Sequence, residues 1–309
     1  MDERDAYAEY RPLLFSIAYR MIGSVSEAED IVQETFLRFH RADTEQVESP
    51  KAYLSAITTR LAIDHLRSAR VRRETYVGPW LPEPLVTDDS DALGADPARH
   101  AETADSLSLA FLVLLERLSP VERAVFLLRE VFGYGYGEIA DVVAKREDNV
   151  RQIAARARHH VEDGRPRFEA DRRHREELAR RFLAAVEEGD TDGLVGMLAA
   201  DVTMYGDGGG KAPAVGQPVA GAVRVARFLV GLTRQAKRAN LRLVPAEVNG
   251  QPGMIAYDQA GGLISVLSLD IADGLVQTVH SIVNPDKLRH LGPISDWSWQ
   301  QDPGGAEPG

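Results

Sequence analysis

The sequence has 309 residues, of which 44% are hydrophobic and 27% charged, and its formal net charge is -11, which predicts a globular chain of two or three small domains. It contains no cysteine, which excludes disulfides, thiolate zinc sites and redox-sensing thiols. No stretch approaches 18 uninterrupted apolar residues and no apolar signal segment follows the charged start, so the sequence predicts a cytoplasmic protein that makes no membrane contact.

The first 75 residues show helical periodicity. Apolar residues recur at helical spacing over 7–18 and again over 31–39, which predicts two packed helices. A third helix begins at Pro50, and the segment 51–73 has six basic residues against a single acid, Asp64, with Arg60, Asp64, Arg67 and Arg70 on the outer face. Such a face matches a nucleic-acid backbone, and an ordinary solvated helix face is the alternative interpretation.

The segment 76–103 has the composition of a linker. It contains four prolines and six acidic residues against one arginine, so it is acidic and cannot form a continuous helix. Negative charge between two basic modules would mask them or repel DNA in the free protein. Trp80 lies between prolines and is a candidate interface anchor, with a cap on a local core as the alternative.

The segment 104–168 has the spacing of a helix-turn-helix. A helical stripe over 107–118 ends at Ser119, which with Glu122 forms a predicted capping box, and the next helix runs to about Val131. A short helix over 138–143, a turn without glycine at 144–147 and a final helix follow.

The final helix has an apolar and a polar face. The apolar residues follow the 3.6-residue period and are predicted to be buried: Val150, Ile153, Ala154, Ala157 and Val161. On the outer face, Arg151 and Gln152 are predicted to read base edges, and Lys145, Arg156 and Arg158 to hold phosphates. A helical hairpin with an exposed basic surface is the alternative.

In residues 172–300 most of the predicted helices come before most of the predicted strands. Helical patterns lie at 178–186 and 194–198, a strand surrounds Val202 and Met204, and a helix follows from Gly221 to Lys237. The strand-like runs are 241–248, 254–257, 263–272 and 275–283, the last two joined by Asp273-Gly274 as a hairpin turn. This order predicts an α+β domain with a curved antiparallel sheet, followed by a disordered tail at 301–309, with Trp297 and Trp299 as docking residues before it.

Acidic and histidine side chains in this domain require an enzyme to be considered. Asp201, Asp207, Asp258 and His280 are the available acid or base groups, and Asp207 with Lys211 in the glycine-rich loop is a candidate anion site. Turn caps and a packed histidine are the alternative, and no acid and base stand at a fixed spacing. We therefore predict no catalytic residue, no metal site and no cofactor.

The run Glu29-Asp30-Ile31-Val32-Gln33-Glu34-Thr35-Phe36, followed by 50–54 and 63–67, resembles region 2 of the extracytoplasmic-function sigma factors of bacterial RNA polymerase. The helix-turn-helix is similar to region 4 of the same family. The resemblance implies that Asp30, Gln33, Glu34 and Phe36 contact the clamp helices of core polymerase, with the flap as a further contact. It also implies contacts to the melted -10 element from Lys51, Tyr53, Arg60, Asp64, Arg67 and Arg70, with the loop 41–49 near the extruded base, and contacts to the duplex -35 element from the second helix of the helix-turn-helix.

The order of elements in 172–300 resembles the SnoaL-like (NTF2-like) cone-shaped fold of polyketide cyclases, which often encloses a pocket. Three motifs resemble the sigma-factor-J-like group, which carries such a domain fused to the sigma modules. They are Trp80-Leu81-Pro82-Glu83-Pro84, Asp207-Gly208-Gly209-Gly210-Lys211 and Asn284-Pro285-Asp286-Lys287-Leu288. The resemblance implies that these residues form a regulatory interface that replaces a separate anti-sigma protein.

Together these features predict a multidomain chain: region 2 at 1–75, a linker at 76–103, region 4 at 104–168 and a SnoaL-like regulatory domain at 172–300. The predicted function is promoter-specific transcription initiation with core RNA polymerase and promoter DNA as partners, and a small ligand in the C-terminal domain is left open. The alternatives are a DNA-binding repressor or activator that never contacts polymerase, and a SnoaL-like enzyme with a DNA-binding appendage.

Overall fold

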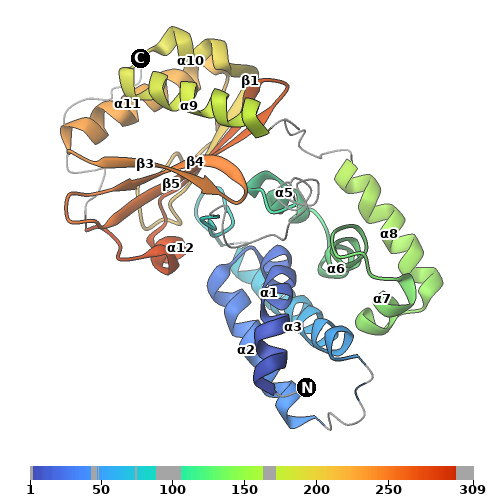
Figure 1. Cartoon of the computed structure of the whole chain (residues 1–309). Helices are drawn as coiled ribbons and strands as arrows, with labels where there is room; N and C mark the ends of the chain where they lie inside the picture. Colours follow the sequence, from blue (N-terminus) through green and yellow to red (C-terminus); the bar gives the residue numbers. More distant parts are fainter. Residues whose placement is uncertain are drawn as a thin grey trace. The chain divides into compact units, whose positions relative to one another are not determined.

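The computed structural model describes residues 3–42, 47, 49–73, 75–87, 106–162 and 172–296. Their contacts form two compact units (Figure 1). The helical unit combines Met1–Thr75 with Phe111–Arg165, and the α+β unit combines Tyr76–Ala110 with Pro166–Gly309. The predicted tail at 301–309 lies outside the described residues, as do Trp297 and Trp299. No helix in the described ranges is long and apolar enough to cross a membrane.

The helical unit begins with three helices, α1 (Glu3–Ile22), α2 (Val25–Arg41) and α3 (Pro50–Arg73). Ser24 caps α2, since its side chain accepts a hydrogen bond from the backbone N–H of Glu27. The apolar stripes of the three helices meet in a common core, as the periodicity predicts. Its buried members are Leu14, Val32, Phe36, Phe39 and Leu54.

The rest of this unit comes from the helix-turn-helix segment. It contains α5 (Leu109–Leu115), α6 (Pro120–Phe126), the π-helical turn η2 (Leu127–Val131), α7 (Tyr136–Val143) and α8 (Glu147–Glu162). The predicted capping box is confirmed, because Ser119 and Glu122 exchange side-chain to backbone hydrogen bonds at the start of α6. The predicted buried face of α8 is also confirmed.

The turn between α7 and α8 contains no glycine, and an alanine takes the conformation that glycine usually adopts there. Ala144 adopts the left-handed conformation that glycine normally supplies after a helix, with φ of 52°. The backbone N–H of Lys145 then bonds back to the carbonyl of Ala140 at 3.0 Å. The two helices of the predicted helix-turn-helix are therefore joined by a tight turn that ends α7 at Val143.

The α+β unit packs helices against one sheet. The helices are α9 (Arg172–Glu188), α10 (Thr191–Met197) and α11 (Ala222–Arg238), with α12 (Pro285–Leu288) and the 3-10 turn η3 (Arg289–Leu291) near the end. The strands are β1 (Leu198–Asp207), β2 (Val219–Ala220), β3 (Arg242–Val248), β4 (Gln251–Tyr257), β5 (Leu263–Ala272) and β6 (Leu275–Ile282), in the order β2-β1-β6-β5-β4-β3.

The predicted antiparallel sheet is found except at one pair of strands, because β1 pairs with β6 in parallel. Strands β3 to β6 follow one another by short connections and form an antiparallel meander. β1 joins β6 only after the chain has passed through α11 and this whole meander, and so long a connection permits parallel pairing. Parallel pairing brings the carboxyl ends of β1 and β6 to the same edge of the sheet.

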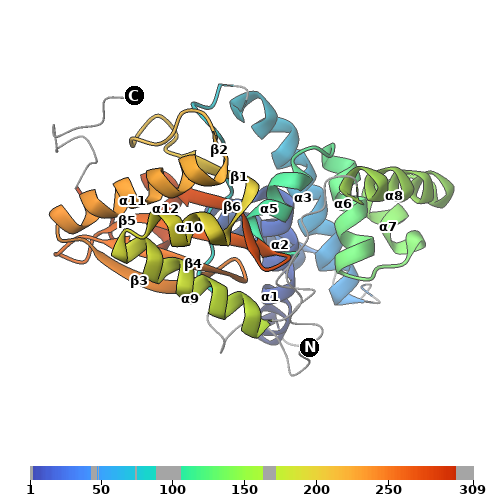
Figure 2. The same ribbon diagram turned by 90° about the horizontal axis from the view of Figure 1, so that it is seen from above.

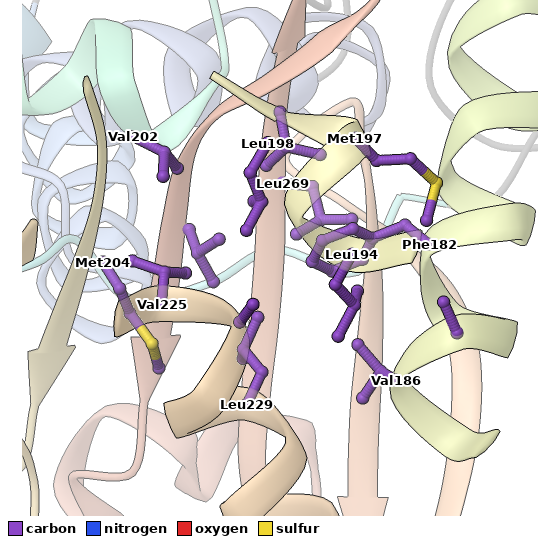
Figure 3. Close-up of a cluster of buried hydrophobic side chains, with 14 of the residues drawn as sticks. Phe182, Val186, Leu194, Met197, Leu198, Val202, Met204, Val225, Leu229 and Leu269 are labelled. Atoms are coloured by element: carbon purple, nitrogen blue, oxygen red, sulfur yellow. The ribbon is translucent and has the colours of Figure 1, made fainter. Parts of the chain in front are cut away.

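One face of the sheet carries the core of this unit. Helices α9, α10 and α11 cover that face (Figures 1 and 2). Figure 3 shows Phe182 and Val186 of α9, Leu194 of α10 and Leu229 of α11 gathered over Leu269 of β5. Alternate β5 residues point to this face, so burial of their apolar side chains fixes the register of the strand.

Candidate nucleic-acid interface

The exposed face of α2 holds most of the residues predicted to meet polymerase. Asp30 and Gln33 are exposed, and the half-buried Glu34 pairs with Arg38 at 2.7 Å. Phe36 does not belong to this face, since it is only 7% exposed and packs in the three-helix core with its ring 4.6 Å from that of Tyr7.

Leu37 occupies the same face one helical turn after Gln33. It is 51% exposed, which is unusual for a leucine beside a well-packed core. The sequence pattern does not identify Leu37, because it directly follows the buried Phe36 and falls outside the apolar face of the helix. No motif marks it as an exposed residue. The face therefore combines acidic and amide groups with an exposed apolar side chain.

The outer face of α3 presents several of the residues predicted for the -10 element. Lys51, Asp64 and Arg67 are exposed, and Arg67 pairs with Asp64 at 3.1 Å. Tyr53 is 37% exposed and its ring lies 6.1 Å from that of Phe39, so it is both a core contact and a surface group. The side chain of Arg70 and most of the loop 41–49 lie outside the described residues.

Helix α3 also contacts the helix-turn-helix within the helical unit. Arg60 donates to the backbone carbonyls of Val142 at 2.8 Å and Asp141 at 2.5 Å, at the carboxyl end of α7. These carbonyls are the acceptors that a helix end leaves unpaired, and a cation is favourable there. Sequence reasoning placed Arg60 on DNA, whereas in this structure its guanidinium caps a helix.

A second contact joins α3 to the loop before α7. The hydroxyl of Tyr134 donates to Ser55 Oγ at 2.7 Å, and Lys51 Nζ lies 6.0 Å from the Tyr134 ring centroid. Since Tyr134 is buried, its hydroxyl needs this partner. Helix α3 and the helix-turn-helix are thus packed together through Lys51, Ser55 and Arg60.

The outer face of α8 carries the residues predicted for the -35 element, and all of them are exposed, together with Lys145 in the preceding turn. Arg151 lies 4.5 Å over the ring of Tyr136 and pairs with Glu147. Arg158 pairs with Glu130 at 2.6 Å, and this hydrogen bond raises the pKa of Arg158. Two arginines of this face are therefore pre-oriented by neighbouring side chains.

A different site lies in the α+β unit, at the carboxyl end of β1. Asp207 is completely buried there, and its carboxylate accepts three hydrogen bonds. The donors are the backbone N–H of Leu81 at 2.8 Å, the hydroxyl of Tyr76 at 2.5 Å and Lys287 Nζ at 2.7 Å. A buried carboxylate is stable only with such partners, so Asp207 ties the linker to the sheet.

Lys287 is the centre of the same site. Besides Asp207, its ammonium donates to the carbonyl of Leu81 and lies 4.3 Å from a ring centroid of Trp80 and 4.9 Å from that of Tyr76. Asn284 Nδ2 donates to the Tyr76 hydroxyl at 2.8 Å. We name Asp207, Asn284 and Lys287 the linker-binding site, and residues 76–87 the linker segment.

Glycines permit the close approach of the linker segment. A Cβ on Gly209 would lie 2.2 Å from Asn284 Nδ2 and 2.9 Å from the Tyr76 hydroxyl, and one on Gly210 would lie 3.3 Å from Val77 Cβ. Both glycines also have positive φ, 57° and 70°. The three motifs that sequence reasoning grouped as one interface, 80–84, 207–211 and 284–288, do meet here.

Further contacts that the sequence did not reveal hold the second half of the linker segment. Asn249 Oδ1 accepts from the N–H of Leu85 at 2.9 Å, and Asn249 Nδ2 donates to the carbonyl of Leu107 at 2.9 Å. Val86 forms an antiparallel bridge with Val248, and His290 Nε2 lies 2.8 Å from the carbonyl of Pro84. The chain is held on the α+β unit both at 76–87 and where it returns at Leu107.

Several of the groups considered for catalysis have structural partners. Lys211 pairs with Asp286 and Asp207 with Lys287, so Asp207 and Lys211 do not form an anion site. Asp258 accepts from Ser295 Oγ and from the N–H of Gly262 at 2.7 Å, and these hydrogen bonds lower its pKa. Asp201 is exposed on β1.

His280 and Asp270 form a buried pair. His280 Nδ1 lies 3.2 Å from Asp270 Oδ2, although the two atoms are not in hydrogen-bond geometry. Burial lowers the pKa of His280 to about 4 and raises the pKa of Asp270 to about 7. Both groups therefore favour their neutral forms inside the domain.

Comparisons with known proteins match this arrangement. The family model for sigma-70 region 2 matches residues 6–72, and the model for sigma-70 region 4 matches residues 108–161. The ECF RNA polymerase sigma factor SigJ of Mycobacterium tuberculosis is 39% identical over 298 residues, covering 93% of each chain. The probable ECF RNA polymerase sigma factor SigI of the same species is 33% identical, covering 93% of this chain and 94% of that one.

A solved structure is similar over nearly the whole chain. The crystal structure of the Mycobacterium tuberculosis extracytoplasmic function sigma factor SigJ superimposes with a TM-score of 0.73 at 34% sequence identity. It covers 94% of this chain and 99% of that one. The similarity therefore includes the α+β unit as well as the two helical segments.

Proposed function

Since this chain belongs to the extracytoplasmic-function (ECF) RNA polymerase sigma factors, we propose how its parts divide the work of promoter recognition. Sigma factors are non-enzymatic subunits that bind core RNA polymerase and promoter DNA and direct initiation. The observation that carries the assignment is 39% identity to a named ECF sigma factor across 93% of the chain. The division of work proposed below rests on the contacts of the individual side chains.

The exposed face of α2 is the proposed polymerase contact. Asp30, Gln33 and Glu34 would meet the clamp helices, and the flap would meet region 4. Phe36 supports this face from the core, and the exposed Leu37 supplies apolar area that a polymerase surface would bury. Burial of one exposed leucine together with a ring of polar contacts is typical of an interface centre.

The promoter contacts are assigned to α3 and α8. Lys51, Tyr53, Asp64, Arg67 and Arg70 would hold the melted -10 strand, since single strands are held by cations and aromatic faces. On α8, Arg151 and Gln152 would read -35 base edges. The phosphate contacts would come from Lys145, Arg156 and Arg158.

The packing of α3 on the helix-turn-helix favours a closed free state. Lys51 and Arg60 face α7 and its preceding loop, and the two hydrogen bonds of Arg60 measure 2.8 and 2.5 Å. The -10 and -35 elements lie about 25 base pairs apart, which is roughly 85 Å of duplex at 34 Å per turn. Segments in hydrogen-bond contact cannot occupy both elements, so we propose that α3 and α7 separate on polymerase.

The α+β domain is the proposed regulator of this step, acting in the cytoplasm where the polymerase works. It holds the linker segment through Asp207, Asn284 and Lys287 and therefore controls how much chain is available between the two modules. A small ligand in this domain would be the signal that it reads. No separate anti-sigma protein is required for such control.

The first experiment mixes the purified full-length protein with core bacterial RNA polymerase. A stable complex that initiates from a promoter the core cannot use is the expected result. If the full-length protein fails, a chain ending at Phe168 separates two causes. Activity of the shorter chain would mean that the extension masks the modules, and failure of both, with footprinting of promoter DNA by the protein alone, would favour a repressor.

Substitution tests the base contact assigned to Arg151. Arg151→Ala should lower initiation at a promoter with an intact -35 element by about tenfold to a hundredfold, the range for loss of one bidentate base contact. Arg180→Ala is the control, because Arg180 likewise pairs with a glutamate on an exposed helix but lies on α9. Equal activity of the two variants would remove Arg151 from the -35 contact.

A further inference from the structure

The α+β unit contains a partly open cavity of about 250 Å³ between its helices and the sheet. Phe182 and Val186 of α9, Leu229 of α11 and Met204 of β1 line it, and Figure 3 shows these four side chains around the same face of the sheet. A concave and mainly apolar hollow of this kind is the usual form of a small-molecule site. A space of this size in the described part of the domain therefore needs an explanation.

The lining indicates what kind of molecule fits. None of the residues around the cavity is charged, and most are aliphatic or aromatic. The polar side chains of Ser265, Ser281, Thr233 and Gln235 interrupt this apolar surface, and none of the three hydroxyls has a hydrogen-bond partner among the described residues. A charged ligand would lose its hydration here without an opposite charge, which excludes ions and phosphate esters.

The size sets an upper limit. Pockets that take drug-sized ligands typically measure about 300–1,000 Å³, so this cavity fits a somewhat smaller molecule. We propose that the cavity binds a neutral, mainly apolar molecule of roughly two fused rings whose carbonyl or hydroxyl oxygen meets the hydroxyls of Ser265 and Ser281.

The same strand ends form the cavity and the linker-binding site. Gly206 and Val283 line the cavity, and the next residues, Asp207 and Asn284, hold the linker segment. Successive residues of a strand point to opposite faces, so the two sites lie back to back on β1 and at the end of β6. A ligand that shifts these strand ends therefore changes the hold on the linker segment. This consequence rests on the regulatory role proposed above, whereas ligand binding itself does not.

Binding is tested with prodan, a neutral naphthalene that carries one ketone and changes its emission with polarity. Titration into the full-length protein should give a saturable blue shift. Ala236→Phe fills the cavity, because Ala236 is buried on α11 and lines it. That variant should lose the shift, whereas Val223→Phe, an exposed position on the same helix, should keep it.

Two outcomes would overturn the site: no saturable shift in the unsubstituted protein, or the same affinity in Ala236→Phe. Ser281→Ala keeps the cavity open and serves if the larger residue prevents folding. Loss of one hydrogen bond should weaken prodan binding by about threefold to tenfold, and unchanged affinity would remove the hydroxyl from the proposal.

Hydrogen exchange tests the link to the linker segment. The N–H of Leu81 bonds to Asp207 and the N–H of Leu85 to Asn249, so only the former lies at the shared strand end. Saturating prodan should change the exchange rate of Leu81 more than that of Leu85. Equal rates with and without prodan would overturn the coupling. Neither measurement uses polymerase or DNA, so a failed transcription experiment would leave the binding site in place.

Discussion

Asp207 shows how a single buried charge can organise the contact between the linker segment and the rest of the α+β unit. Its carboxylate is fully buried and meets Lys287 at 2.7 Å, while two linker groups supply the remaining hydrogen bonds. Burial of the Tyr76 ring and the bond to this carboxylate raise the pKa of Tyr76, so its hydroxyl stays a donor. The contact is therefore held by one ion pair and the neutral groups around it.

Replacement of this carboxylate should be costly. Asp207→Asn leaves the ammonium of Lys287 buried without its counter-charge, and breaking a buried pair in this way typically costs about 3–5 kcal/mol. Urea unfolding followed by tryptophan fluorescence reports the α+β unit through Trp80, whose ring lies 4.3 Å from Lys287 Nζ. Asp286→Asn is the control, because its pair with Lys211 is exposed and is worth about 1 kcal/mol at most. Similar losses in both variants would contradict the role of Asp207.

The pair of Asp270 and His280 should leave a signature in the pH dependence of stability. His280 is buried in its neutral form, so only the unfolded chain binds a proton as the pH falls from 6.5 to about 4. The free energy of unfolding therefore decreases over this range. Asp270 is also buried in its neutral form, and its contribution to the free energy of unfolding is complete below its unfolded pKa of 3.8. This contribution is lost as the pH rises to about 7, because the unfolded chain then releases the proton first. The two slopes oppose each other, so the pair adds little net pH dependence between 4 and 6.5.

Single substitutions should expose each slope. Asp270→Asn should make the protein less stable at pH 4 than at pH 6.5 by on the order of 3 kcal/mol. His280→Gln should do the opposite and lose stability as the pH rises from 4 to 7. Unfolding curves at several pH values measure both, and parallel curves for the two variants would show that the groups do not titrate as described.

Some of the side chains that hold the linker segment could be predicted from the sequence, and others could not. Asp207, Asn284 and Lys287 were recognised because they stand in short motifs. Tyr76 was not, since a lone tyrosine carries no periodic signal and its partner, Asp207, is 131 positions away. Phe36 was placed on the wrong side of α2 because a family pattern marks residues and not the direction in which each one points.

Among the elements, the turn between α7 and α8 allows a direct test. Ala144 has positive φ, which costs an alanine roughly 1 kcal/mol compared with glycine. Ala144→Gly should therefore raise the melting temperature of the helical unit by a few degrees, measured by circular dichroism. Ala155→Gly, at an exposed position inside α8, should lower it instead. A decrease in both variants would contradict the assigned turn geometry.

Helices and hairpins followed from local patterns, whereas their pairing did not. Strand β5 lies at the predicted residues, and Asp273-Gly274 forms the predicted hairpin turn with φ of 52° and 70°. Asn249-Gly250 has nearly the same conformation, and this dipeptide was an available signal that would have extended β4 to Gln251. The parallel pairing of β1 with β6 depends on contacts distant in sequence, which no local pattern records.

For the whole molecule, the segment between the two sigma modules matters most. Its composition predicted a tether, but the structure packs residues 76–87 and Leu107 against the α+β unit. The composition of a segment indicates whether it can fold by itself in water. It does not indicate which surface of the protein the segment packs against. Both ends of the connection are thereby fastened to a third domain in the same chain.

The contacts at 76–87 and at Leu107 determine how much of the chain between regions 2 and 4 is free to extend. With both fastenings in place, region 2 is joined to the α+β domain beside Thr75, and region 4 is joined to it beside Ala110 and again at the junction of Arg165 and Pro166. With both released, the chain from Tyr76 to Ala110 spans up to roughly 115 Å when fully extended at about 3.3 Å per residue. That exceeds the roughly 85 Å between promoter elements, so under the proposed regulation the release of the linker segment would give the chain the length that its promoter requires.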